Sequence, residues 1–106
     1  TLVEHNAEDY VTYLCNVFAD APAFQAAARQ WGIEEEQHGR ALARWCQLAD
    51  PNFDPAQAMA DFQAHYRLPL DATDSVRGSL NGELVARCVV ECGTSSFYSA
   101  IRDATE

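Results

Sequence analysis

The hydrophobic positions between Phe24 and Ala49 repeat with the period of an α-helix. Steps of four and three residues alternate, which keeps the side chains on one helical face. The face comprises Phe24, Ala28, Trp31, Glu35, His38, Leu42, Trp45 and Ala49. Most of these residues are apolar, as a core-facing stripe requires, but Glu35 and His38 at its centre are polar. Because burying an unpaired carboxylate is costly, the pattern predicts a compensating partner, and a metal ion shared with facing helices would serve.

Two further stretches carry the same repeat and predict two more long helices. The first covers about residues 2 to 19, and its stripe extends backwards onto Glu4. The last runs from about Leu80 to Thr105, and Glu91 falls within its stripe. Each predicted helix therefore places a carboxylate in an apolar face. For Glu91 the alternative is an ion pair with Arg87, four residues earlier on the same helix.

Proline and aspartate residues separate these helices. The segment 20–22 (Asp-Ala-Pro) predicts a tight turn, so that the first two long helices are antiparallel neighbours. The second helix then runs from Pro22 to about Ala49, and a short helix over residues 56–66 follows an Asp-Pro start within a long connection, residues 50–79. Gly39 either admits a neighbouring backbone or is an ordinary surface glycine. The chain is thus expected to be all-α, a single antiparallel bundle domain over residues 1–106.

Composition narrows the range of functions. A net charge of −9 argues against nucleic-acid and anionic-membrane partners and suits a protein that attracts cations, although ordinary solubility is an alternative reason for it. The sequence contains no apolar run of membrane-spanning length and no signal-peptide pattern, so a soluble, cytoplasmic protein is expected. The four cysteines form no C-x-x-C pair and are expected to be reduced, small buried side chains.

The segment from Trp31 to Gly39, WGIEEEQHG, resembles the W-x-x-E-E-x-x-H-G segment of the acyl-carrier-protein desaturases. Glu35 and His38 also fit the E-x-x-H motif of the ferritin-like superfamily, within which rubrerythrin-like proteins are the most similar in size. The segment 90–95 (VECGTS) resembles the part of the third helix that carries a lone Glu in that superfamily.

This resemblance implies a ferritin-like bundle with a dinuclear iron centre, although manganese or zinc would also suit the ligands. It implies an oxidoreductase or peroxidase that acts on dioxygen or peroxide. Glu35 would bridge or chelate the metals, His38 would bind one of them, and Glu91 would be the third-helix ligand. Glu4 is the preferred ligand from the first helix, and Glu8, in a context similar to the first helix of ferritins, is the reserve.

The chain departs from the family in one respect: no fourth long helix with a second E-x-x-H follows Glu91, and the rubredoxin-like cysteine module is also missing. Three explanations are open. The chain is a fragment without its last helix, or two copies form a homodimer with a four-helix site, or the site is degenerate and free of metal. The last explanation leads to a different function, a helical association module in which Glu35 and His38 form a buried hydrogen-bonded pair.

Overall fold

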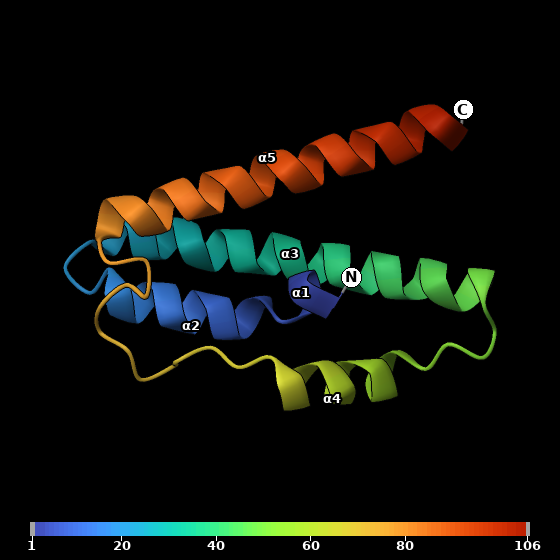
Figure 1. Cartoon of the computed structure of the whole chain (residues 1–106), viewed down its shortest axis with the longest axis horizontal. Helices are drawn as coiled ribbons and strands as arrows, with labels where there is room; N and C mark the ends of the chain where they lie inside the picture. The colour runs from blue at the N-terminus through green and yellow to red at the C-terminus, as the bar shows by residue number, and fades with distance from the viewer. Residues whose placement is uncertain (1, 106) are drawn as a thin grey trace. The chain divides into compact units, whose positions relative to one another are not determined.

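The computed structural model describes residues 2–105, and all regular secondary structure in that range is α-helical (Figure 1). The elements are α1 (Leu2–His5), α2 (Ala7–Val17), α3 (Pro22–Ala49), α4 (Pro55–His65) and α5 (Leu80–Thr105). The predicted all-α class is confirmed, as are the bounds of α3 and α5. The chain divides into two compact units, Thr1–Thr73 and Asp74–Glu106, which are described in turn. Within residues 2–105, no helix combines the length and the apolarity needed to cross a bilayer.

The ends of α3 and α4 follow from local chemistry. Pro22 occupies the first turn of α3, where its missing N–H costs no hydrogen bond. At the other end, the N–H of Asp50 donates to the carbonyl of Cys46 at 2.8 Å and closes the last turn. Asp54 caps α4, since its Oδ1 accepts from the N–H groups of Ala56 and Gln57 at 2.9 and 3.1 Å. The predicted short helix in the connection is therefore present, shifted by one residue.

The prediction of one continuous helix over residues 2 to 19 is wrong, because the helix breaks at Asn6. The apolar repeat continues across this position, but Asn6 itself is only 4% exposed and its backbone angles (φ −90°, ψ 21°) lie outside the helical range. Its buried Oδ1 accepts a hydrogen bond from Nε2 of Gln63, in α4, at 3.2 Å. A buried amide needs such a partner, and here the partner comes from a distant part of the chain.

The core of the first unit is formed mainly by α2. Its buried side chains are packed by part-buried residues from α3 and from the segment after α4; the buried members are Tyr10, Tyr13, Leu14, Val17 and Phe18. The rings of Tyr10 and Tyr13 meet edge to face, with centroids 6.3 Å apart. The hydroxyl of Tyr66 donates to that of Tyr10 at 3.3 Å, which attaches the end of α4 to this core.

Two glycines on α3 set how closely α1 and α2 approach it. A Cβ at Gly39 would lie 2.7 Å from the backbone nitrogen of His5, and a Cβ at Gly32 would collide with Cγ2 of Val11. The two glycines are seven residues apart, so they share one face of α3. The first of the two interpretations of Gly39, close approach of a neighbouring backbone, is thus confirmed.

The second unit consists of α5 and the turn before it. The hydroxyl of Ser75 donates to Oε2 of Glu83 at 2.7 Å, and Oγ of Ser79 accepts from the N–H of Gly82 at 3.0 Å. Gly78 has φ +82°, a left-handed conformation that favours glycine. These contacts fix the start of α5 at Leu80, as the sequence predicted.

Candidate functional site

Glu35 and His38 lie one above the other on a single turn of α3. Oε1 of Glu35 is 3.2 Å from Nδ1 of His38, within hydrogen-bonding distance. The two side chains differ in burial, since that of Glu35 is 14% exposed and that of His38 is 58% exposed. Glu35 therefore faces inward, as the stripe predicted, whereas His38 lies at the edge of that face.

The residues on either side of Glu35 show how specific its placement is. Glu34 accepts a hydrogen bond from Nε2 of Gln30 at 3.0 Å, and Glu36 forms an ion pair with Arg40 on the exposed side of the helix. Of the three consecutive glutamates, Glu35 is the least exposed: its side chain is 14% exposed, against 55% for that of Glu36. Helical geometry accounts for this, because successive residues point about 100° apart around the axis.

The two candidate ligands from the amino-terminal region, Glu4 and Glu8, differ in their position along α3 and in their burial. Val11 packs opposite Gly32 and His5 opposite Gly39, so these segments run antiparallel to α3 and residue 8 or 9 is level with Glu35. Glu8 is therefore closer than Glu4 to the level of Glu35 along the axis of α3, but Glu8 is exposed. Glu4 lies about one turn further along and is buried, with 8% exposure. Burial favours Glu4, in agreement with its position in the apolar stripe.

Glu91 lies on α5, in the second unit, and is exposed. The expectation of a carboxylate in a buried face is met on α5 by another residue, Glu83, which is 1% exposed. Spacing alone gave no reason to prefer Glu83, because it sits at the edge of the apolar stripe and its burial accompanies the hydrogen bond from Ser75.

The donor atoms of Glu35 and His38 suit a divalent cation. A carboxylate oxygen and an imidazole nitrogen on one turn are ligands that iron, manganese and zinc accept, and a cation bound to both would take the place of the hydrogen they share. Among residues 2–105, however, no group of three or more His, Cys, Asp or Glu side chains is placed to hold a metal. Two donors are thus brought together by α3, and further ligands would have to join them.

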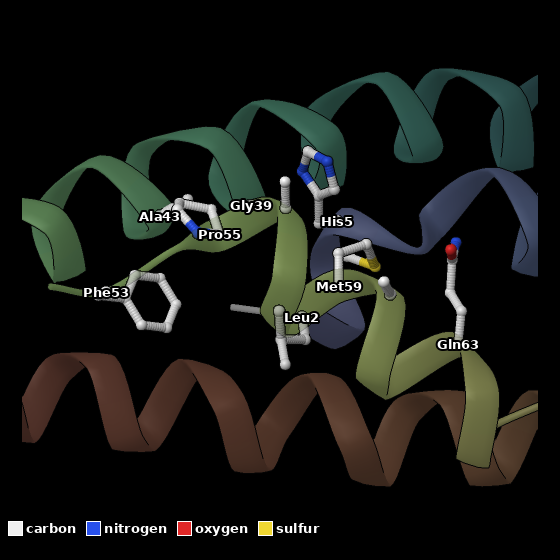
Figure 2. Close-up of a pocket in the computed structure, with 10 residues that line it drawn as sticks. Leu2, His5, Gly39, Ala43, Phe53, Pro55, Met59 and Gln63 are labelled. Carbon is white, nitrogen blue, oxygen red and sulfur yellow. The ribbon is translucent and has the colours of Figure 1, made fainter.

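A cavity next to this turn was not anticipated from the sequence. It measures about 470 Å³ and lies between α1, α3 and α4, with the imidazole of His5 and the Met59 side chain lining it near Gly39 (Figure 2). The sequence holds no local signal for it, since it depends on how α4 packs against helices that are distant along the chain.

Comparison of the chain with protein-family models, with curated proteins and with solved structures returns no match. The placement and chemistry of the side chains must therefore carry any functional conclusion.

Proposed function

We propose that this chain is a ferritin-like, rubrerythrin-related protein that holds a dinuclear iron centre and reduces dioxygen or peroxide. The observation that supports the proposal best is the inward-facing Glu35, which is bonded to His38 on a helix face that packs against a segment carrying the buried Glu4. A carboxylate at such a position needs a compensating charge or hydrogen bonds. A cation bound by Glu35 and His38 would supply such a charge.

Each residue has a distinct part in this proposal. Glu35 and His38 would each supply one donor atom to the metal, and the 3.2 Å between Oε1 and Nδ1 places these two donors side by side. Glu4 would add a carboxylate from α1. The buried Tyr10 and Tyr13 help to keep water out of the adjacent core. Bound iron would supply the electrons for reducing the oxygen species.

A site shared between two copies would provide the second E-x-x-H motif that the resemblance requires. In a homodimer with two-fold symmetry, each copy would supply one Glu4 and one Glu35/His38 pair, which doubles the ligand set.

Anaerobic titration with ferrous iron, followed by a peroxide-consumption assay, tests the proposal. Glu35→Gln and His38→Gln should each abolish or strongly weaken iron binding, since each removes a donor atom while preserving side-chain size. Glu34→Gln is the matched control, because it changes the same charge on an exposed position of the same turn. Iron binding that is equally weak in the control, or no binding by the unmodified chain, would refute the proposal.

A second candidate is a helical association module without metal. It is favoured by the hydrogen bond between Glu35 and His38 and by exposed apolar side chains near the end of α3, Trp45 (64%) and Leu48 (66%). Chelator treatment separates the two candidates. A metalloprotein should melt at a lower temperature after chelation, whereas the association module should be unaffected and should respond to protein concentration alone.

A further inference from the structure

The cavity between α1, α3 and α4 is lined mainly by apolar groups. Figure 2 shows Phe53, Pro55 and Ala43 at one end, and the cavity volume is about 470 Å³. This volume lies within the range of cavities that bind small organic molecules. Although the chain has sixteen acidic residues, the lining contains no carboxylate, so the cavity does not select a cation.

Two polar side chains, His5 and Gln63, contribute to the lining. Nε2 of Gln63 donates to Asn6, which fixes the amide and leaves its carbonyl oxygen to act as an acceptor. The imidazole of His5 shows no hydrogen bond to any other side chain or carbonyl within residues 2–105, although its backbone is held against Gly39. A neutral imidazole can donate through one nitrogen and accept through the other.

We infer that this cavity binds a small, uncharged apolar molecule carrying one hydroxyl group, such as an alkylphenol. The apolar end holds the hydrocarbon body, and the hydroxyl accepts a hydrogen bond from a ring N–H of His5 and donates its one proton to the Gln63 carbonyl, which belongs to the same lining. A carboxylate is disfavoured, because the net charge of −9 repels anions. This inference is independent of the proposed iron centre, since none of its steps uses Glu35 or His38.

Binding can be followed through Met59, the single methionine of the sequence, which lines the cavity. The full chain, labelled with ¹³C at the methionine methyl group, is titrated with p-cresol and with p-xylene, which replaces the hydroxyl by a methyl of similar size. Met59→Leu identifies the resonance. Both ligands should shift the Met59 methyl resonance, and the shift should reach a plateau as the ligand concentration rises. If neither ligand shifts this resonance at any concentration up to the ligand's solubility limit, the inference is wrong.

Substitutions then test the hydroxyl contact. His5→Phe keeps a ring at the site but removes the hydrogen bond. The affinity for p-cresol should therefore fall about three- to tenfold, and the affinity for p-xylene should change by less than about twofold. Equal effects on both ligands, or none on p-cresol, would overturn the assignment of the hydroxyl. Tighter binding of p-toluate than of p-cresol would also overturn it, in favour of an anion site.

A second pair of variants tests the location without altering His5. Ala60→Leu places a larger side chain into the cavity from α4 and should reduce the affinity for both ligands by at least about tenfold. Ala64→Leu is the matched control, because Ala64 is exposed on the same helix and does not line the cavity. If Ala60→Leu leaves both affinities unchanged, the ligands bind elsewhere and the inference fails.

Discussion

Helices α2 and α5 both carry an apolar stripe at helical spacing, but they differ sharply in what they bury. In α2, five of eleven residues are buried, four of them large apolar or aromatic side chains. In α5, one of twenty-six is buried, and that residue is the carboxylate Glu83. The repeat in a sequence thus shows which face of a helix is apolar, but burial is decided by the partner that covers it. For α2 the partner is α3, whose glycines permit close contact.

The largest expected effect is that of Tyr13→Ala. Tyr13 is fully buried, so the substitution removes a complete aromatic ring from the core of the first unit. Removing a buried aromatic side chain costs about 3–5 kcal/mol in the free energy of unfolding. Urea denaturation, followed by circular dichroism, measures it.

Phe97→Ala is the corresponding control on α5, since Phe97 is 61% exposed. Its effect should stay within about 0.5 kcal/mol, as for most surface substitutions. Comparable losses from the two variants would show that α5 and α2 are buried to the same extent, contrary to the contrast drawn between them.

The next largest effect is expected for Gly39→Ala. The added methyl would lie 2.7–2.9 Å from the backbone and Cβ of His5, so α1 must shift away from α3. Overpacking of this kind costs about 1–3 kcal/mol, which exceeds the gain in helix propensity from replacing glycine. Hydrogen exchange of the Asn6 amide, which donates to the carbonyl of Leu2 at the end of α1, should become faster. An unchanged or increased stability would mean that α1 is not held against Gly39.

Gly93→Ala should raise the stability, whereas Gly39→Ala should lower it. Gly93 lies on α5, and a Cβ there meets no atom within 4 Å. The substitution should therefore raise the stability of the helix by about 0.5–1 kcal/mol, because alanine loses less backbone entropy. Thermal melting of both glycine variants in the same buffer makes the comparison direct. A loss of stability would reveal a close neighbour of α5 at this position.

Much of the fold could be predicted from the sequence because it depends on local signals. Pro22 and Asp54 mark helix starts through backbone chemistry within a few residues, and the structure has α3 and α4 beginning where these signals indicate. The break at Asn6 could not be predicted, since the oxygen of its buried side chain accepts a hydrogen bond from Gln63, fifty-seven residues away. The cavity near His5 escaped prediction for the same reason.

The candidate site likewise has features that the sequence predicts and features that it does not. The inward placement of Glu35 follows from the α3 stripe alone. The exposure of His38 does not, because three residues turn the helix by about 300°, and this displacement puts its side chain at the edge of the packed face. The burial of Glu83 depends on a turn conformation that brings Ser75 to it, and the sequence gives no periodic signal for that turn.

The smallest expected effect concerns an exposed ion pair on α3. Glu36 and Arg40 form an ion pair at i, i+4, with both side chains more than half exposed. Such pairs contribute about 0.3–0.5 kcal/mol, and the contribution should vanish near 1 M salt because mobile ions screen it. Arg40→Ala should therefore lower stability slightly in dilute buffer and not at high salt. Arg102→Ala serves as the control on α5, where Arg102 pairs with the adjacent Asp103 and both side chains are equally exposed. Because adjacent residues do not share a helical face, this pair should contribute less than the i, i+4 pair, and the salt-dependent loss should be smaller for Arg102→Ala than for Arg40→Ala. If both variants respond equally to salt, the difference in pair geometry between the two helices has no energetic consequence.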